Sequence, residues 1–518
     1  MKITFKDLLW VAASGALTAL AFPRLSLSVL AWVSLIPLFY ILSRHTPGKS
    51  FFLSFLAGFV FYGILLMWIP SVPKHYGNLS PTTSALIYIA LITFLGLFWG
   101  LFGMMFARIR IRYRSLAFIL APLLWIGVEY LLTFVLTGFP WGLLGTTQYR
   151  NLPFIQSATL AGVFGLSFLI VLLQSLFVLS MLIKKRLPFF IGLGAVLLAH
   201  LAGLIALSRV PASAESFQAG VVQGNVSADI DWSQATTEET TALFRRHLDL
   251  TRQAAQQGAQ LIVWPEFSVP LCFSCPEPLY EQFENDLVRF AQTNGVTLLV
   301  GSVETDGDED HPHHTNSALC LTPDGSLSQY SKRHLVPFGE YVPYPGIFSW
   351  ARQLTQAVGQ ITPGRSYVLH SFGSLKFGSP ICYEIIFPDL VRRFVKGGAH
   401  FLTTITNDSW YGRSSAPSQH FAMAVLRAVE NRRFLVRAAT TGISGLVDPY
   451  GRLLARSRLM TQDVLVGTVT PGRGLTFYTR HGDWLPQAGL TFSFVIFMLA
   501  FLTRIHERQK RDGSRRIF

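Results

Sequence analysis

Three polar residues in the second half of the chain follow short apolar segments, and their side chains combine into one kind of chemistry. Glu266 ends the segment LIVWPE, Lys332 follows SLSQYS, and Cys382 ends FGSPIC. A thiol with a pKa of about 8.5 is a weak nucleophile at neutral pH unless a base or a cation assists it. Glu266 can accept the thiol proton, and Lys332, with a backbone N–H after Cys382, can stabilise the oxyanion of a tetrahedral intermediate. The sequence therefore predicts covalent catalysis by a cysteine that needs no histidine.

Each of these residues also has a structural interpretation when it is taken alone. A glutamate after Trp-Pro can cap a helix, a lysine in YSKRH can be solvated, and a cysteine after isoleucine is often a small core residue. The catalytic interpretation depends on their combination, because the ends of strands are where α/β domains gather active-site groups.

The segment from about residue 215 to about 480 has the composition of a globular domain and is long enough to bury its own core. Its short β-rich runs alternate with amphipathic helical runs, which predicts an α/β layered fold. We expect strands over 217–226, 259–266, 295–304, 399–410 and 434–455, hairpins that turn near 323–325 and 372–374, and helices over 236–258, 276–295 and 418–433.

Apolar runs of membrane-spanning length lie on both sides of this segment and predict a multi-pass helical membrane domain over 1–207. The first run is short, and it can also be half of a re-entrant pair that breaks at Pro23. We expect seven helices over 8–22, 26–43, 51–70, 84–106, 116–136, 158–183 and 187–207, an eighth over 486–503, and a basic tail over 504–518.

The basic residues predict how these helices are oriented. Eleven Lys and Arg residues in alternate loops and six after Thr503 fall on one side, whereas the short loops of the other side hold only Arg24, Lys74 and Arg150. The positive-inside rule then places both termini in the cytoplasm and the 215–480 domain outside. Residues 208–503 hold 23 Lys and Arg against 25 Asp and Glu, so the formal net charge of +14 reflects membrane orientation and indicates no nucleic-acid surface.

All four cysteines lie in the segment that we expect to be exported: Cys272, Cys275, Cys320 and Cys382. The first two form a C-x-x-C pair. We favour a disulfide or plain surface thiols over a metal site for this pair, because zinc takes four ligands and one C-x-x-C supplies two.

Five segments of the predicted domain resemble one enzyme superfamily. VWPE, YSKRHLVPFGEYVP and GSPICYE, in that order and spacing, are similar to the Glu, Lys and Cys segments of the carbon-nitrogen hydrolase (nitrilase) superfamily, and TNDSWYG and RAATTGISGLVDPYG resemble its later segments. With seven apolar helices before the domain and one after it, the resemblance narrows to the apolipoprotein N-acyltransferase family and covers essentially the whole chain. It implies an αββα sandwich with Glu266 as general base, Lys332 as oxyanion-stabilising amine and Cys382 as the nucleophile that becomes an acyl thioester.

The same resemblance implies roles for four further residues. Glu340 matches a second essential carboxylate, with a buried salt bridge to Lys332 as the structural alternative. Tyr383 and Glu384 match the pair that follows the nucleophile. Trp232, in DIDW, resembles a tryptophan near the acyl site, with an ordinary surface or core aromatic as the alternative.

Other polar residues in these segments are expected to be structural, since Asn and Asp favour turns and charged residues on a helix usually form ion pairs. His420 has no paired acid and is expected to be a satisfied histidine outside the chemistry. The residues to which we assign loop, packing or ion-pair roles are Asn407, Asp408, Trp410, Arg427, Glu430 and Arg432.

The family's reaction moves an acyl chain from a phospholipid to the amino group of diacylglyceryl-cysteine at a lipoprotein N-terminus. The resemblance thus implies these two partners in a bacterial inner membrane, no cofactor and no metal, and we expect a monomer. Drawing a chain of about sixteen carbons into water would cost more than roughly 10 kcal/mol, so the site must meet its substrates at the bilayer surface. The apolar loops 270–276 and 341–350 form either a lipid-facing lid or ordinary packing on the domain.

Two other classes of function remain as alternatives. In a membrane-anchored amidase or nitrile hydrolase, water would resolve the same thioester, and free fatty acid would appear in place of acylated peptide. A transporter or lipid-binding receptor is disfavoured, because Asp7 and Glu129 are the only carboxylates before residue 207 and ion-coupled pumps need intramembrane carboxylates.

The basic asymmetry predicts that a reporter inserted between Asp306 and Asp310 is exported. Alkaline phosphatase at this position should be active, and a green fluorescent protein that folds only in the cytoplasm should stay dark. The same two reporters fused after Phe518 serve as the control and should give the opposite pair of signals. Fluorescence from the internal fusion would overturn the orientation.

Overall fold

The computed structural model describes residues 2–75, 77, 79–208, 215–227, 236–267, 269, 271–306, 313–344, 346 and 361–515, with side chains up to Leu499. Two compact units make up the chain. The helical unit comprises Met1–Met67, Leu86–Ala206 and Asp483–Phe518, and the α/β unit comprises Trp68–Ala85 and Leu207–Gly482.

The helical unit contains four helices that are long and apolar enough to cross a membrane within the described part of the chain: α3, α5, α8 and α9. Three shorter apolar helical segments, Ser28–Leu42, Leu116–Leu131 and Trp484–Leu499, lie among them. The number of crossings therefore stays a prediction. The bounds are α1 (Phe5–Leu20), η1 (Ser28–Trp32), α2 (Ile36–Leu42), α3 (Pro47–Leu65), α5 (Pro81–Tyr113), α6 (Leu116–Leu131), α8 (Ala158–Ile183), α9 (Leu187–Ser208) and α15 (Trp484–Arg515).

The single helix predicted over 26–43 is wrong, because η1 and α2 are separate. The buried side chain of Gln174, on α8, satisfies the backbone between them: its Oε1 accepts from the Leu35 N–H at 2.7 Å, and its Nε2 donates to the Ala31 carbonyl at 3.0 Å. Irregular backbone inside an apolar unit is stable only when its polar groups find such partners.

The α/β unit contains two six-stranded sheets. The first has the order β12-β1-β2-β3-β4-β5, and the second has the order β11-β10-β9-β8-β7-β6. The first-sheet strands are β1 (Phe217–Gln223), β2 (Leu261–Val263), β3 (Thr297–Asp306), β4 (His313–Leu321), β5 (Leu327–Ser331) and β12 (Asp463–Val469). Those of the second sheet are β6 (His370–Phe372), β7 (Leu375–Gly378), β8 (Phe401–Thr406), β9 (Leu435–Ala439), β10 (Gly445–Val447) and β11 (Leu453–Arg456).

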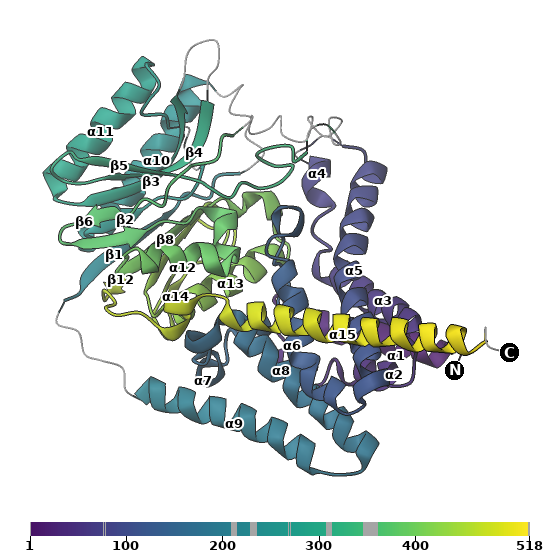
Figure 1. The fold of residues 1–518 in the computed structure, drawn as a ribbon. Coiled ribbons are helices and arrows are strands. Elements are labelled where there is room, and N and C mark those ends of the chain that lie inside the picture. The colour runs from purple at the N-terminus through teal and green to yellow at the C-terminus, as the bar shows by residue number, and fades with distance from the viewer. Residues whose placement is uncertain are drawn as a thin grey trace. The chain divides into compact units, whose positions relative to one another are not determined.

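The sheets pack face to face between two helical layers, as the predicted αββα sandwich requires. Helices α10 (Thr237–Gln256) and α11 (Pro278–Asn294) cover the first sheet, and α12 (Pro388–Lys396) and α13 (Ala416–Asn431) cover the second (Figure 1). Between the sheets, the ring of Phe217 on β1 lies 5.0 Å from that of Phe401 on β8. Burial of both faces is complete in the strands β2, β8 and β9, in which every residue is buried.

A short segment between two apolar helices belongs to the α/β unit and was not expected there. Trp68, 7 % exposed, donates from Nε1 to Gln419 Oε1 at 3.3 Å, and its ring lies 4.9 Å from that of Tyr411. The helix α4 (Ser71–His75) follows it and contacts the turn Asp408–Tyr411. This strap, Trp68–Ala85, thus ties a distant part of the sequence to the α/β unit.

Candidate active site

The strand directions bring three of the predicted residues to one edge of the sandwich. Glu266 lies after the carboxyl end of β2, which is parallel to β3, and Asn407 directly follows β8, which is parallel to β9 in the other sheet. Lys332 directly follows β5, which is separated from β3 by the antiparallel strand β4 and so runs in the same direction as β3. Carboxyl ends of strands that run the same way meet at one edge, which is where α/β folds bind ligands.

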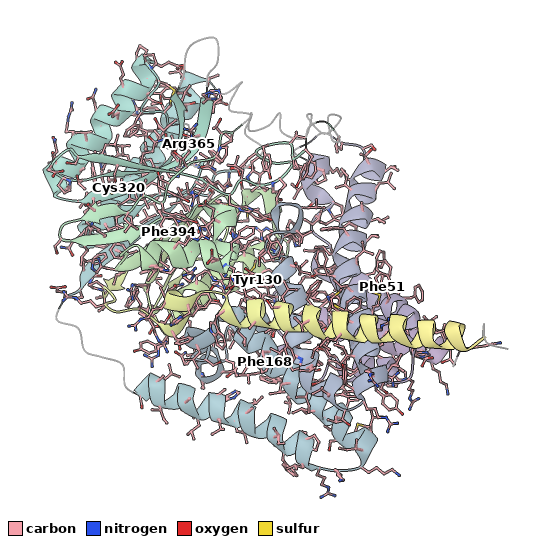
Figure 2. The ribbon with its side chains drawn as sticks, in the orientation of Figure 1. Phe51, Tyr130, Phe168, Cys320, Arg365 and Phe394 are labelled. Carbon is pink, nitrogen blue, oxygen red and sulfur yellow. A yellow bond between two sulfur atoms is a disulfide. The ribbon has the colours of Figure 1, made fainter. Side chains whose placement is uncertain are left out.

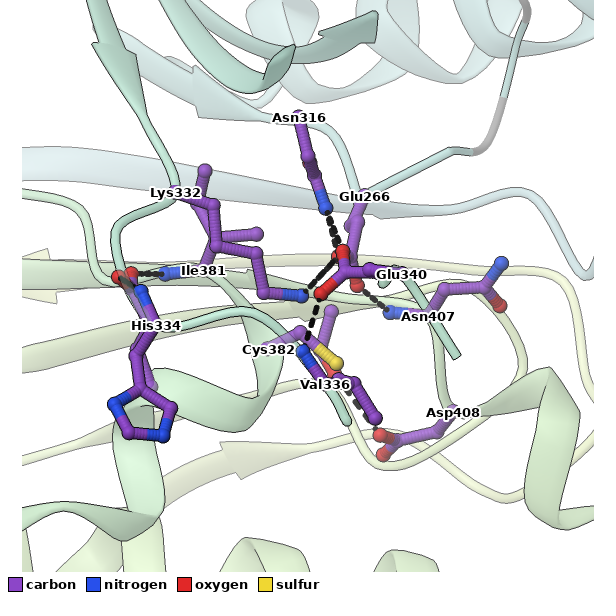
Figure 3. A network of polar contacts seen from close by, with 12 residues as sticks. Glu266, Asn316, Lys332, His334, Val336, Glu340, Ile381, Cys382, Asn407 and Asp408 are labelled. Carbon is purple, nitrogen blue, oxygen red and sulfur yellow. Dashed lines mark hydrogen bonds and ion pairs between the residues drawn. The ribbon is translucent and has the colours of Figure 1, made fainter. Parts of the chain in front are cut away.

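The Lys332 ammonium lies between two carboxylates and is 1 % exposed. Its Nζ donates to Glu266 Oε1 at 3.1 Å and to Glu340 Oε1 at 2.9 Å (Figure 3). Burial lowers the pKa of Lys332, but the charges of Glu266 and Glu340 raise it more, so the pKa lies above its ordinary value. The lysine is therefore a permanent cation at the centre of the site.

Asn316, on β4, links the same two carboxylates and was missed by the sequence analysis. Its Nδ2 donates to Glu266 Oε1 at 2.7 Å and to Glu340 Oε1 at 2.8 Å. The two acceptors fix the orientation of the amide, because its oxygen would repel both carboxylates. The only signal was an Asn inside the otherwise buried strand segment NSALCL, 1 % exposed in the structure.

The backbone holds the remaining oxygens of the two carboxylates. The N–H of Asn407 donates to Glu266 Oε2 at 2.8 Å, and the N–H of Val336 donates to Glu340 Oε2 at 2.7 Å. Each carboxylate is thus bound at both oxygens, which fixes its position relative to Lys332. The salt bridge proposed as the structural alternative for Glu340 is present, and it holds the amine in place.

Cys382 differs from its predicted place at the end of a strand. Strand β7 ends at Gly378, Ile381 forms an isolated bridge with Ile405, and Cys382 opens the 3₁₀ helix Cys382–Ile386 with φ of 49°. Such a left-handed conformation is strained for a residue other than glycine and is typical of functional sites. It turns the cysteine out of the strand, and Figure 3 shows it beside the network around Lys332.

The Cys382 thiol is 6 % exposed, and its environment keeps it protonated at rest. Burial raises the pKa of this thiol, the Glu266 charge raises it further, and Lys332 lowers it by less. A thiolate at Cys382 therefore needs a base that takes the proton as the new bond forms. The other free cysteine, Cys320 (Figure 2), is buried on β4, and burial raises its pKa to about 12.

Glu384 links the loop that carries Lys332 to the loop that carries Cys382. It is fully buried and accepts from the N–H groups of Arg333 at 2.8 Å, His334 at 3.1 Å and Ile381 at 2.8 Å. The Tyr330 hydroxyl also donates to it at 2.8 Å. Its role in this structure is to position the two loops.

Tyr383 is 4 % exposed, and its ring packs 5.2 Å from that of Phe387 and 5.7 Å from that of His334. Trp232, which the resemblance placed near the acyl site, lies outside the described residues.

The loop role expected for Asn407 fits its side-chain contact, because its Oδ1 accepts from the Ser409 N–H at 3.2 Å in a turn.

The expectation that His420 has no paired acid is wrong. Its Nδ1 lies 3.0 Å from Asp408 Oδ1, and its Nε2 lies 3.1 Å from the carbonyl oxygen of Cys382. Arg437 completes this buried cluster with an ion pair to Asp408 Oδ2 at 2.9 Å.

Arg427 and Glu430, to which we assigned packing and ion-pair roles, form a buried ion pair at 2.7 Å.

The described part of the first apolar loop packs on the α/β unit. Cys272 and Cys275 are disulfide-bonded, and Leu271 is 2 % exposed in the core. The N–H groups of Phe273 and Ser274 donate to Glu304 at 3.0 and 2.8 Å. Of the second loop, positions 345 and 347–350 lie outside the described residues.

Comparisons with known proteins match two parts of the chain to protein families. Residues 218–474 match the family model for carbon-nitrogen hydrolases, and residues 14–176 match that for the apolipoprotein N-acyltransferase N-terminal domain. The chain is 38 % identical to an apolipoprotein N-acyltransferase of Geobacter metallireducens, covering 96 % of this chain and 95 % of that one. It is 33 % identical to that of Azotobacter vinelandii, with the same shares covered.

Among solved structures, the chain is similar to Nit3 of Saccharomyces cerevisiae, a member of the nitrilase superfamily. The TM-score is 0.39 at 19 % identity, covering 50 % of this chain and 91 % of that one.

Replacing Glu384 with Gln should loosen the Cys382 loop. The amide would replace one carboxylate oxygen with an NH₂ donor. If its oxygen stays with the Arg333 and His334 N–H groups, the NH₂ faces the Ile381 N–H, which then loses its acceptor. A buried donor left unpaired costs about 1–3 kcal/mol. We expect a lower thermal midpoint and a changed rate of Cys382 alkylation by iodoacetamide, measured in detergent by mass spectrometry. Glu281→Gln, an exposed change on α11, is the control. Wild-type values for both quantities in Glu384→Gln would contradict the positioning role.

Proposed function

The chain belongs to the apolipoprotein N-acyltransferase family, and from this premise we propose that it moves an acyl chain from a phospholipid, through a thioester on Cys382, to the N-terminal amine of a diacylglyceryl-cysteine lipoprotein. This proposal is supported by four helices that are long and apolar enough to cross a membrane, among the described residues, and by the match of residues 218–474 to the carbon-nitrogen hydrolase family. The product of this reaction is a lipoprotein with an acylated N-terminus.

The observation that carries the mechanism is the buried Lys332 ammonium, bound to Glu266 and Glu340 beside the Cys382 thiol. We assign Glu266 as general base, Cys382 as nucleophile, and Lys332 as the cation that stabilises developing negative charge. Glu340 keeps Lys332 paired while Glu266 carries a proton.

In the first half-reaction, the Cys382 sulfur attacks the ester carbonyl of the phospholipid as Glu266 takes the thiol proton. The carbonyl oxygen becomes an oxyanion, which Lys332 and the N–H of Tyr383 stabilise. When the intermediate collapses, the ester C–O bond breaks and Glu266 returns the proton to the leaving alkoxide. The products are an acyl thioester on Cys382 and a lysophospholipid.

In the second half-reaction, the lipoprotein amine attacks the thioester carbonyl and passes a proton to Glu266. The C–S bond of the second tetrahedral intermediate breaks, and the leaving sulfur recovers the proton from Glu266. An amide and the free thiol result. Because the lysophospholipid leaves before the amine enters, the kinetics are ping-pong.

The cost of moving an acyl chain into water supports a site at the outer surface of the inner membrane, where both substrates keep their chains in lipid. We propose that both termini are cytoplasmic and that the enzyme works as a monomer. No step of this reaction needs a metal or a cofactor.

A covalent intermediate predicts that label accumulates before the acceptor is added. Protein incubated with phospholipid labelled in its acyl chain should carry label that neutral hydroxylamine releases, and Cys382→Ala should carry none. Cys320→Ala removes the other buried free thiol and is the matched control, which should label normally. Label on Cys382→Ala, or none on wild type before the peptide is added, would exclude the thioester route.

The fate of the label separates the two enzymatic alternatives. On addition of a diacylglyceryl-cysteine peptide, an N-acyltransferase passes the label to the peptide amine. Release as free fatty acid at the same rate with and without peptide would instead identify a hydrolase.

Lys332→Met should slow thioester formation by about 10²- to 10³-fold, roughly 3–4 kcal/mol of lost transition-state stabilisation. The stopped-flow or quenched rate of labelling measures this loss, and the thermal midpoint reports whether the variant folds. Lys376→Met, at an exposed position on β7, is the control for removing a lysine from the same unit. A folded Lys332→Met protein that labels at the wild-type rate would reduce Lys332 to a structural cation.

A further inference from the structure

A buried cluster outside the proposed catalytic residues contacts the backbone of the nucleophile. His420, on α13, is fully buried, with Nδ1 3.0 Å from Asp408 Oδ1 and Nε2 3.1 Å from the Cys382 carbonyl oxygen. Arg437, on β9, pairs with Asp408 at 2.9 Å, and its Nη2 lies 3.1 Å from His420 Nδ1. Gly442 closes the cluster, since a Cβ there would lie 2.2 Å from Asp408 Oδ2.

The partners of His420 determine where its proton must be. A carbonyl oxygen can only accept, so the contact with Cys382 requires a proton on Nε2. Nδ1 can donate to Asp408 when the ring is charged and can accept from Arg437 when the ring is neutral. The hydrogen bond from Nε2 to the Cys382 carbonyl therefore persists in both charge states of the imidazole.

Fixing this carbonyl also fixes the next N–H. The peptide between Cys382 and Tyr383 is planar and trans, so its C=O and N–H bonds point to opposite sides. Cys382 has φ of 49°, a strained conformation that persists only when its surroundings determine it. A hydrogen bond to the carbonyl also polarises the peptide and strengthens its N–H as a donor.

We propose that His420 is a positioning residue that aims the N–H of Tyr383 at the oxyanion, with Asp408 and Arg437 holding the imidazole. This inference depends on the proposed function, because the oxyanion belongs to the acyl-transfer intermediates. It assigns to the peptide after the nucleophile a support from the His420 side chain, through the hydrogen bond to the Cys382 carbonyl. The contact is to backbone, so His420 itself touches no substrate atom.

Two conservative variants separate this role from ordinary packing. The amide nitrogen of Gln reaches about as far from the backbone as Nε2, and that of Asn about as far as Nδ1. His420→Gln should therefore keep the donor to the Cys382 carbonyl, whereas His420→Asn should lose it. We expect His420→Asn to slow thioester formation from labelled phospholipid by about 10- to 100-fold, with KM for phospholipid unchanged, and His420→Gln to recover most of that loss.

Alkylation of Cys382 by iodoacetamide gives a second readout, because this reaction forms no oxyanion. It should proceed at the same rate in wild type, His420→Asn and His420→Gln. His370→Asn is the matched control: this histidine is also fully buried in the α/β unit, where it bonds Ser328, and its loss should lower stability without slowing labelling of the folded protein.

Equal labelling rates in folded His420→Asn, His420→Gln and wild type would overturn the inference. A fall in alkylation that parallels the fall in labelling would also overturn it, since His420 would then place the thiol and not the N–H. Absence of label from wild type, with normal alkylation of Cys382, would instead overturn the proposed function and remove the inference together with it.

Discussion

The site depends on one buried ammonium ion and the groups that compensate it. Taking Lys332 and two carboxylates out of water carries a large desolvation penalty, and removing a single partner would leave an uncompensated buried charge. Lys332 balances only one of the two negative charges, and Asn316 and two backbone N–H groups stabilise the excess. This balance suits the proposed chemistry, because transfer of the Cys382 proton to Glu266 moves a negative charge from carboxylate to sulfur and leaves the total unchanged around Lys332.

The polar contacts that surround this ion connect loops from both sheets. Glu384 joins the turn after β5 to the loop before Cys382, and the Asn407 N–H joins the end of β8 to Glu266 at the end of β2. The sandwich sets the distance between these strand ends, and the hydrogen bonds set the orientation of each group. Precision at the site thus comes from contacts between loops, whereas the buried strands supply the rigid base.

The sequence predicted the parts of the fold that local patterns encode. Alternating strands and helices predicted an α/β layered fold, and the family resemblance added the αββα class. Thr and Glu residues predicted the start of α10, where Thr236 and Glu239 form both halves of a capping box. Local patterns could not predict contacts between segments that are distant in the sequence. Strand β12 pairs with β1 from almost the other end of the unit, and the side chain of Gln174 bonds the backbone where the helix expected over 26–43 is broken. Nothing in either local pattern identifies the partner.

The same limit explains what was found and missed at the site. Glu266, Lys332 and Cys382 stand out because each is a reactive type placed after an apolar run. Asn316 bonds Glu266, which is remote in sequence, and His420 bonds Asp408, from which a turn separates it. Their residue types alone therefore did not identify them as part of the site. The left-handed backbone at Cys382 is likewise imposed by its neighbours, and no propensity of cysteine foretells it.

The strap Trp68–Ala85 determines the order in which the parts of the α/β unit become available during synthesis. It emerges from the ribosome well before Leu207–Gly482, yet it packs with them in one unit. The contacts of the Trp68 indole with Gln419 and Tyr411 can therefore form only after these residues are synthesised, some 340 residues later. A fragment that begins at residue 207 would lack Trp68, and the turn at Tyr411 would lose this ring contact. The α/β unit is consequently built from two separate parts of the sequence, and a fragment that begins at residue 207 contains only one of them.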